Sequence, residues 1–487
     1  MSRPCALLLM MLLGGFGARG DENAWLVPLG RPPPAAPRRI AGGEAVPPLP
    51  LPATPLRRSE RKRQPSPPVV AAKIIWGESA LFTRENGMAE KVADWNQCPA
   101  DLQQLLAKTG RWAGLSYSSE PMTLTQFHGD PEKLPLLLVN GSRTICLDRN
   151  EQARMRDFVR KGGMVLFDSI AGSPYFYQSA CELAQALFPE LERRTIPADH
   201  PIYHILYDVD TVRFPKNRET DKPFLEGLYV GSRIGVLISK FGLGCAWDDH
   251  EVPLLDQAVY YDVTSGIQLG MNILAYAVGY AHAGLVEAKP ELFGSLDERR
   301  PTDEFVFGQI QHGGAWNVHP GAAAALLRRL RQDTALRVSL KRLPVTLGRD
   351  DLAGFTFLCL TGLDDFQLDG KAVAALREFL NSSGTLFINN GLGLRTFDQA
   401  VRRELKKVLP ESSLAPVPRT HPIFGTAFQI EKVAYTPAVR RVQPDLAAPV
   451  LEGVPIDGNL RVIYSPFDLE AAWLGCEYPL AAAYENE

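Results

Sequence analysis

Short apolar runs alternate along this chain with longer stretches in which apolar residues recur at helical spacing. Residues 136–139 and 164–167 are continuous apolar runs of strand length. Between them, Asp148 followed three residues later by Glu151 has the pattern of a capping box that opens a helix, and Gly163 follows the expected helix end. Apolar strands separated by amphipathic helices are typical of a parallel sheet with helices on both faces.

The second half of the chain repeats this pattern, with strand-like runs at residues 355–360 and 385–388 and a helix cap at Asp369. Identical residues recur at an offset of 221, since Trp95 pairs with Trp316 and 316 − 95 = 221. A repeat of this length indicates two tandem domains of one fold rather than a solenoid. Further pairs at this offset are Gly141 and Gly362, Asp148 and Asp369, Phe158 and Phe379, Gly163 and Gly384, Phe176 and Phe397, and His200 and His421.

After the shared His-Pro step, the two copies realign at an offset of 226, where Trp247 pairs with Trp473. The first copy continues into residues 266–276, which predict a C-terminal helix, and the second copy has no such segment by Glu487. One face of the second sheet should therefore be partly uncovered or covered by something else. The first copy is the obvious candidate for that cover.

The N-terminal region has a different composition. Residues 21–72 hold 13 of the 39 prolines, which lack the N–H group that helices and central strands need, so we expect an extended, disordered linker. The basic run 57–63 is either a solvated charge run or a contact for an anionic envelope surface. Residues 1–20 have the order of a cleaved secretory signal, with cleavage expected after Gly20. The alternative is an uncleaved anchor, but the apolar run 6–17 is shorter than the ~20 residues that span a membrane.

Composition excludes several classes of function. The charges nearly balance and the pI is about 6.3, which argues against nucleic-acid binding. The six cysteines after Cys5 show no C-x-x-C spacing, so we expect no zinc site. Asp248, Asp249, His250 and Asp256 are more typical of a polar loop than of a metal site. We assign no metal and no cofactor, and no run after the signal is long and apolar enough to span a membrane.

The second copy carries a series of motifs, in order, at residues 305–311, Trp316, and residues 357–362, 383–387, 421–424 and 462–469. Together they resemble a bacterial domain of unknown function, the DUF4159 family. The first copy resembles a more diverged version of the family over about residues 72–284. The resemblance implies a class I glutamine amidotransferase-like, flavodoxin-type fold in each copy. It implies little about function, because the family's own activity is not established.

The candidate chemistry lies at the carboxyl ends of the strands, where open α/β sheets bind ligands. An amidotransferase would carry a nucleophilic cysteine on the tight turn there, but Asp168-Ser169 and Asn389-Asn390 stand at this place in the two copies. This argues against glutamine hydrolysis, and we lean against an enzyme. The candidate catalytic residues are Asp168, Ser169 and His200, and the candidate ligand-binding residues are Asn389, Asn390 and His421.

Each of these candidates also has a structural interpretation. Asp and Asn at strand ends often bond to local backbone, and the residue before proline often marks a turn. The pairs Trp95-Asn96 and Trp316-Asn317 are interpreted in the same way, as a buried Trp with an Asn that bonds to backbone.

We therefore expect an exported bacterial protein, secreted or periplasmic, that is a non-catalytic binding or scaffold protein of the cell envelope. The alternative is a hydrolase with a single active site in the first copy. A third hypothesis, binding of a carbohydrate or other polar ligand in the cleft between the copies, requires exposed aromatic residues there. The two copies should pack together, and an envelope or protein partner is possible. The expected regions are a signal (1–20), a basic linker (21–72), domain one (73–284), a linker (285–302) and domain two (303–487).

Overall fold

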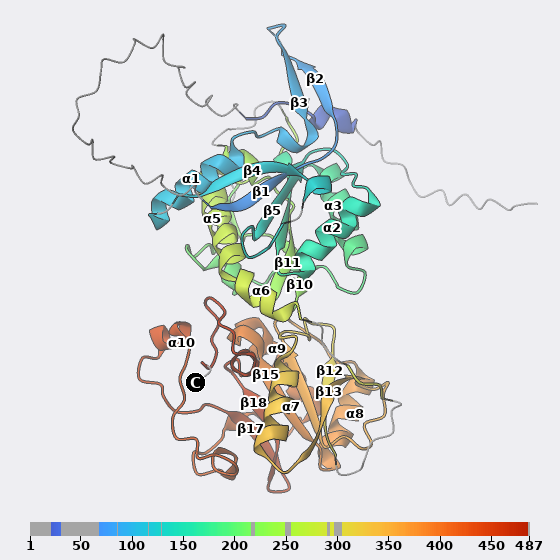
Figure 1. The fold of residues 1–487 in the computed structure, drawn as a ribbon. Coiled ribbons are helices and arrows are strands. Elements are labelled where there is room, and N and C mark those ends of the chain that lie inside the picture. The colour runs from blue at the N-terminus through green and yellow to red at the C-terminus, as the bar shows by residue number, and fades with distance from the viewer. Residues whose placement is uncertain are drawn as a thin grey trace, which may run out of the picture.

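The computed structural model describes residues 21–30 and 68–485, apart from 85, 115, 128, 216–219, 249–254, 290–292 and 297–303. Within this part, the chain forms two α/β domains that lie end to end (Figure 1). We call them copy one (residues 68–288) and copy two (residues 304–485). The predicted signal and most of the predicted Pro-rich linker lie outside the described residues.

Both copies are built on a seven-stranded sheet with the same topology. The order is β4-β1-β5-β6-β11-β10-β7 in copy one and β13-β12-β14-β15-β18-β17-β16 in copy two. Neighbouring strands from β4 to β11 and from β13 to β18 are parallel, whereas β10 and β17 run antiparallel to their neighbours. The tandem α/β fold is thus confirmed, with sheets that are mixed at one edge.

The strands of copy one are β1 (Val69–Ile75), β4 (Ser118–Thr123), β5 (Leu136–Gly141), β6 (Met164–Ser169), β7 (Arg194–Thr195), β10 (Glu226–Val230) and β11 (Arg233–Ser239). Those of copy two are β12 (Glu304–Gln311), β13 (Arg337–Thr346), β14 (Phe357–Gly362), β15 (Thr385–Asn390), β16 (Ala415–Pro416), β17 (Glu452–Ile456) and β18 (Asn459–Ser465). Two hairpins stand apart from the sheets, β2 (Ser79–Thr83) with β3 (Ala89–Ala93) and β8 (Val212–Arg213) with β9 (Thr220–Asp221).

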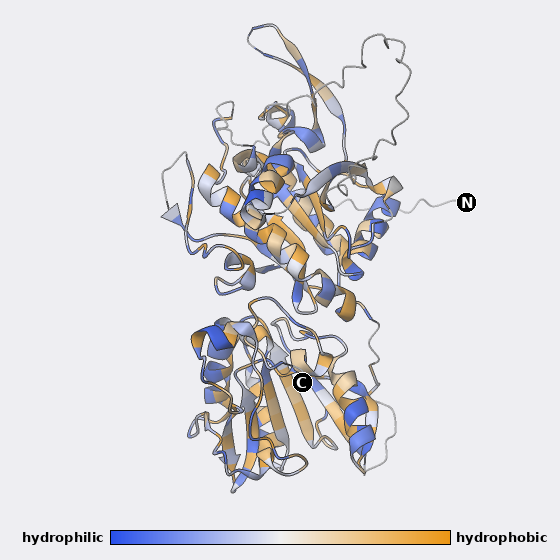
Figure 2. Ribbon diagram, turned by 60° about the vertical axis from the view of Figure 1, so that its left-hand side comes forward, coloured by the Kyte–Doolittle hydropathy of each residue, from blue (hydrophilic) through white to orange (hydrophobic). Residues whose placement is uncertain are grey.

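Helices cover the sheet of copy one on both faces, as its uninterrupted apolar strands require. One face packs against α1 and α5 and the other against α2 and α3, so orange strands lie between helices with blue outer sides in Figure 2. The predicted capping box is confirmed, because the Asp148 carboxylate accepts the Glu151 amide and the Glu151 carboxylate accepts the Asp148 amide. The helices are α1 (Asp101–Ala113), α2 (Arg149–Arg160), α3 (Pro174–Leu187), α4 (Gly244–Trp247), α5 (Val263–Gly279) and α6 (Ala281–Glu287).

Copy two covers its sheet less completely. Its α7 (Ala322–Asp333), α8 (Gly370–Asn381), α9 (Arg395–Val408), α10 (Pro437–Val442) and α11 (Glu470–Leu474) include no counterpart of α5 among the described residues. On the corresponding face, Phe357 and Ile463 are only half-buried, whereas their equivalents Leu136 and Leu237 in copy one are buried. The predicted partial exposure is confirmed. The suggestion that copy one covers this face is wrong, because copy one packs on the carboxyl edge of the second sheet instead.

Two boundaries differ from the sequence interpretation. The first strand begins at Val69, four residues before the predicted start. The expected disorder from residue 21 is not found at its beginning, because residues 22–25 form a short 3-10 helix and Trp25 is 6% exposed. Trp25, Val27 and Leu29 are apolar residues at alternate positions, and a prediction of disorder from proline content alone did not take them into account.

Among the described residues, no single helix is long and apolar enough to cross a membrane. Only α5 and α6 together would reach that length, and they are bent by 43° at their junction.

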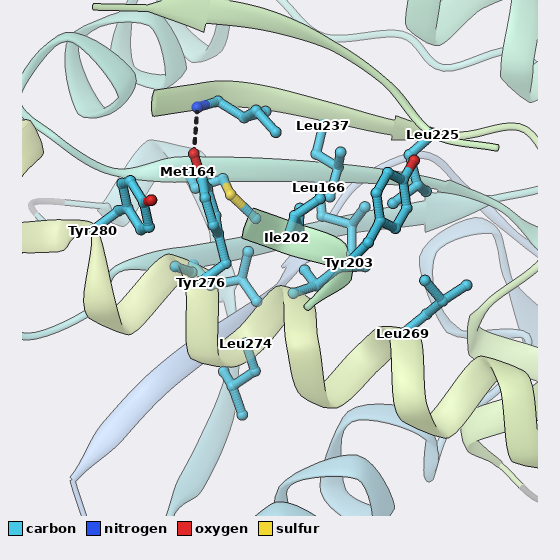
Figure 3. Packing of buried hydrophobic residues seen from close by; sticks show 14 of the residues in the cluster. Met164, Leu166, Ile202, Tyr203, Leu225, Leu237, Leu269, Leu274, Tyr276 and Tyr280 are labelled. Carbon is cyan, nitrogen blue, oxygen red and sulfur yellow. Dashed lines mark hydrogen bonds between the residues drawn. The ribbon is translucent and has the colours of Figure 1, made fainter. Parts of the chain in front are cut away.

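The two copies share one continuous apolar cluster. It runs from the α5 side of the first sheet, where Tyr276 and Tyr280 stack at 4.2 Å between ring centroids, to Leu392 and Tyr478 of copy two. Figure 3 shows the copy-one part, with the hydrogen bond from the Ile234 amide to the Tyr276 hydroxyl. The Tyr280 hydroxyl also donates to the carbonyl of Pro479 across the boundary. The contact between the copies is therefore an extension of the core.

A buried ion cluster lies beside this apolar contact. His319 of copy two is 1% exposed, with Nε2 at 2.6 Å from the Asp468 carboxylate and Nδ1 at 3.3 Å from the Glu287 carboxylate of α6. Burial alone would lower the pKa of His319, but Asp468 and Glu287 outweigh it and raise the pKa to about 10. The hydroxyls of Tyr478 and Ser232 donate to the same oxygen of Glu287, at 2.7 and 2.6 Å. We call this arrangement the histidine clasp.

We expect His319→Ala to destabilise the protein by about 3 to 5 kcal/mol, because removing one partner of a buried ion pair leaves the other charges uncompensated. The measurement is urea unfolding followed by circular dichroism at pH 7. His204→Ala is the matched control, because His204 pairs at 3.1 Å with the exposed carboxylate of Asp208. Equal losses in the two variants would contradict the clasp.

The clasp also predicts a pH dependence. Since the folded pKa of His319 is raised from 6.5 to about 10, its stabilisation should be fully present below pH 6.5 and lost as the pH rises through about 10. The difference in unfolding free energy between wild type and His319→Ala, measured from pH 6 to pH 11, should shrink toward high pH. A difference that is flat over this range would refute the assignment.

Candidate functional site

Asp168 lies at the carboxyl end of β6 and is fully buried. Its two carboxylate oxygens accept the backbone amides of Leu243 and Gly244, each at 2.8 Å, where the short helix α4 begins. Burial raises the pKa of Asp168 to about 7, although these two amides act in the opposite direction. Asp168 therefore caps backbone, as its structural interpretation holds.

The two other catalytic candidates do not join Asp168. Ser169 is buried, and its hydroxyl has no hydrogen-bond partner among the described residues. His200 is fully buried, accepts the Ile202 amide at Nδ1, and packs edge-on against Tyr229. Burial lowers its pKa to about 3, which keeps the ring neutral. Within the described part of the chain, no hydrogen bond connects any two of these three side chains.

The candidates of copy two have similar structural roles. Asn389 accepts the Leu469 amide at 2.8 Å and donates to Asp468 at 2.9 Å, so it takes the place of Asp168 as a cap. Asn390 donates to the carbonyl of Leu394 at 3.1 Å. His421 accepts the Ile423 amide at 3.1 Å, the same turn bond that His200 makes in copy one.

The turn after the strand has an unusual backbone in both copies. Ala171 and Leu392, which are equivalent at the 221 offset, have φ of 54° and 55°, a left-handed conformation that non-glycine residues rarely adopt. The residue held in this conformation is aliphatic and buried in each copy. The strained position of the turn therefore carries no reactive side chain in either copy.

A different pair of residues forms the chemically interesting site. Asn96 and Asn317, of the repeated Trp-Asn pairs, each accept a hydrogen bond from a buried cation. Lys73 Nζ lies 3.3 Å from Asn96 Oδ1, and Arg342 Nη2 lies 2.8 Å from Asn317 Oδ1. The expected bond from Asn to backbone is not found among the described residues, and the Trp of each pair is half-buried rather than buried.

The two cations come from different strands. Lys73 is on β1, and its register partners are Leu138 of β5 and Pro121 of β4. The equivalent place on β12 belongs to Gln309, whose side-chain oxygen accepts Arg342 of the neighbouring strand β13 at 3.3 Å. The positive charge is thus retained although its strand of origin has changed.

In copy one, the cation is paired with a buried carboxylate. Lys73 Nζ lies 2.8 Å from Asp101 Oδ2, and both side chains are nearly inaccessible. Asn140 donates to the same oxygen at 2.8 Å, and the Cys98 carbonyl accepts Lys73 at 2.8 Å. A pocket of about 480 Å³ opens above this pair, lined by Trp95, Asn96 and the edge strand β4.

In copy two, the corresponding pocket becomes a cleft between the copies. It has a volume of about 610 Å³ and is lined by Trp316, Asn317 and His312 of copy two, by Arg194 and Tyr229 of copy one, and by Phe293. His312 accepts the Gly314 amide at Nδ1 and donates Nε2–H to the Thr361 carbonyl, and burial lowers its pKa to about 4. It lines the cleft as a neutral ring.

Four identical residues line both hollows at equivalent positions. They are Trp95 and Trp316, Asn96 and Asn317, Pro99 and Pro320, and Pro121 and Pro344. The first three pairs are visible at the 221 offset, which is the signal that could have identified them. The fourth is not, because Pro121 and Pro344 correspond only through strand register.

The arrangement is suited to binding. Each hollow offers an aromatic ring and an amide held by a cation, and in the first hollow the paired charges of Lys73 and Asp101 form part of the lining. Among the described residues, neither Asn96 nor Asn317 donates its side-chain N–H₂ to another protein group, so this donor is available to a ligand. No group of three or more His, Cys, Asp or Glu in the described part of the chain could hold a metal ion. Asp249 and His250 of the weak metal hypothesis lie outside that part.

The cap at Asp168 can be tested by substitution. Asp168→Asn should cost less than Asp168→Ala, because the Asn oxygen can still accept one of the two amides, as Asn389 accepts the Leu469 amide, while the second amide loses its acceptor. Since the folded pKa of Asp168 is raised to about 7, wild type loses stability as the pH rises through about 7, so the deficit of Asp168→Asn relative to wild type should shrink over that range. Asp168→Ala should cost about 1 to 3 kcal/mol, because it leaves two buried amides unpaired. Thermal unfolding at pH 8 distinguishes the two. Equal destabilisation by both substitutions would contradict the capping role.

Comparison with known proteins identifies each copy. The family "Domain of unknown function (DUF4159)" matches residues 87–278 and 306–478, which lie within copy one and copy two. No curated protein matches the chain. The two matches together cover more than half of the sequence and follow the repeat and both sheets. The chain therefore belongs to the DUF4159 family and contains two tandem copies of its domain.

Proposed function

We propose that this chain is a non-catalytic binding protein whose ligand occupies the cleft between the two copies. The observation that carries the proposal is the duplicated wall of Trp, Asn and two prolines, which lines a hollow in both copies. Core packing alone does not require a half-exposed Trp beside a cation-held amide in two diverged domains. A retained binding surface accounts for it.

The cleft favours a ring-shaped polar ligand, and we infer a saccharide. Trp316 and Phe293, which is 41% exposed, offer flat apolar surfaces to the C–H faces of a sugar ring. The Asn317 side chain offers a hydrogen-bond donor. Tyr229, from the other copy, adds a third ring to the lining of the cleft. Few well-placed polar groups in an aromatic cleft are typical of small-molecule sites.

Both copies are needed to form this site. The Arg194 guanidinium bonds to the carbonyl of Gly313 and lies 3.5 Å from the Asp364 carboxylate, so it bridges the copies at the rim of the cleft. The Asp199 carboxylate also accepts the amide and the hydroxyl of Thr396, at 2.9 and 2.7 Å. A ligand in the cleft would contact a rigid junction, which limits the ordering cost of binding.

We also propose that the protein is exported and acts in the bacterial cell envelope. The support is the signal-like sequence of residues 1–20 and the basic, proline-rich composition that follows it. An envelope location would place the cleft among glycans, which agrees with the inferred ligand class. The hydrolase alternative gains no support, since Asp168 caps α4 and no hydrogen bond links it to Ser169 or His200.

The test is calorimetric titration of the protein with a panel of soluble oligosaccharides of neutral hexoses and N-acetylhexosamines. We expect Trp316→Ala to weaken binding at least tenfold, because it removes the stacking surface. Trp112→Ala is the matched control, since Trp112 of α1 is 56% exposed and lies outside both hollows.

Two results would overturn the proposal. One is equal affinity of the Trp316→Ala and Trp112→Ala proteins for every sugar that the wild type binds. The other is hydrolysis of a panel member that is abolished by Asp168→Asn in a protein that circular dichroism shows to be folded, because this substitution removes the acid.

A further inference from the structure

The segment Asp21–Gly30 lies across the carboxyl edge of the copy-one sheet. All residues from Trp25 to Gly30 are buried, although this segment is separated from β1 by residues 31–68. In Figure 1 its short helix, at the blue end of the colour bar, lies beside the base of the β2–β3 hairpin. This segment is neither part of the sheet nor part of the cleft.

Copy one holds the backbone of the segment with fixed polar groups. The Gln97 side-chain amide donates to the carbonyls of Trp25 and Val27, at 2.7 and 3.2 Å. The backbone carbonyl of Gln97 accepts the backbone amides of Leu29 and Gly30, both at 3.1 Å. The Ser142 hydroxyl donates to the Trp25 carbonyl at 2.9 Å. Backbone recognition of this kind is how protein grooves hold extended peptides.

Alternate side chains of the segment fill an apolar floor. Trp25, Val27 and Leu29 are 6%, 7% and 6% exposed. They form one cluster with Cys98, Ile170, Ala171, Cys245, Ala258 and Tyr260. Trp25 ends the short 3-10 helix, and the Val27 amide donates to the Trp25 carbonyl at 3.0 Å in the turn that follows it. Pockets for alternate side chains give such grooves their specificity.

Gly30, the last residue of the segment, lies where a side chain would clash with copy one. A Cβ atom at this residue would lie 1.5 Å from the Asp248 carboxylate and 2.9 Å from Pro99 Cδ. Asp248 is itself fully buried, so it cannot move aside without disturbing its surroundings. The groove therefore has no room for a side chain at the position of Gly30.

The same edge of copy two is covered as well, but by a different part of the chain. Leu392, the counterpart of Ala171, lies in the apolar cluster that it shares with α5 of copy one. Both copies thus present an apolar carboxyl edge that requires cover. In copy one, the cover is a short peptide rather than a folded domain.

We propose that the carboxyl edge of copy one is a peptide-binding groove whose occupant, the segment Asp21–Gly30 of its own chain, can be exchanged for the same segment of a second copy of the protein. Residues 31–68 could span up to ~125 Å when extended, several times the ~17 Å radius of gyration of one copy. The chain therefore has the length to deliver its segment to a neighbouring molecule. The tether also makes the internal site the favoured one at low protein concentration. This inference is independent of the ligand in the cleft.

The probe is a labelled peptide with the sequence of residues 21–30, added to the full chain and followed by fluorescence anisotropy. Trp25→Ala in the chain should release its own segment, so this protein should bind the peptide at least tenfold more tightly than wild type. Trp112→Ala is the matched control and should behave like wild type. A peptide with Gly30→Ala should bind at least tenfold more weakly than the unchanged peptide to the Trp25→Ala protein.

A second variant keeps the test decisive if Trp25→Ala fails to fold. Gly30→Leu in the full chain should displace the segment, because the new side chain would clash with Asp248, and it truncates no buried side chain. The Gly30→Leu protein should therefore also bind the peptide more tightly than wild type. Equal peptide affinity of wild type and the folded variant would overturn the proposal. So would a Gly30→Ala peptide that binds as well as the unchanged one.

Exchange between molecules should appear as a concentration-dependent dimer of wild type that excess peptide dissociates. A dimer unaffected by the peptide would refute this exchange.

Discussion

The relative position of the two copies depends on one buried imidazole. His319 lies between the carboxylates of Glu287 and Asp468, and a charged ring can be buried there because each N–H group faces a negative partner. Asp468 also accepts the Leu392 amide at 2.7 Å in the turn after β15, so one cation connects the last helix of copy one to that turn. This connection keeps Tyr229 and Trp316, from different copies, on the walls of one cleft.

Duplication has preserved a surface more faithfully than the residues beneath it. Trp, Asn and two prolines are shared by both hollows, whereas the supporting cation is Lys73 on β1 in one copy and Arg342 on β13 in the other. A charge-assisted hydrogen bond to an amide oxygen needs a positive group at the right place, not a particular strand. The amide can therefore keep its orientation while the buried layer below it diverges.

The layers of the fold could be predicted from the sequence, because the spacing of apolar residues and the repeat offset both indicate which positions are buried. The capping box at Asp148, the apolar strands and the missing cover on copy two all follow from patterns within one element. The clasp could not be predicted, because Glu287, His319 and Asp468 are far apart in the sequence and do not recur at the repeat offsets. The segment near Trp25 was missed because its proline-rich surroundings dominated a short alternation of three apolar residues. The Trp-Asn pairs were visible, but their partners, Lys73 and Arg342, sit at positions that no constant offset relates.

The carboxyl edges of the two sheets are covered in different ways. Copy one rests on the edge of copy two through a contact between unlike surfaces, which is the geometry from which open-ended filaments grow. Residues 25–30 occupy the free edge at one end of the stack. At the other end, copy two has no counterpart of α5 and α6 among the described residues to place on a further edge. In the described part of the chain, both carboxyl edges are therefore covered, one by a peptide segment and the other by a folded domain.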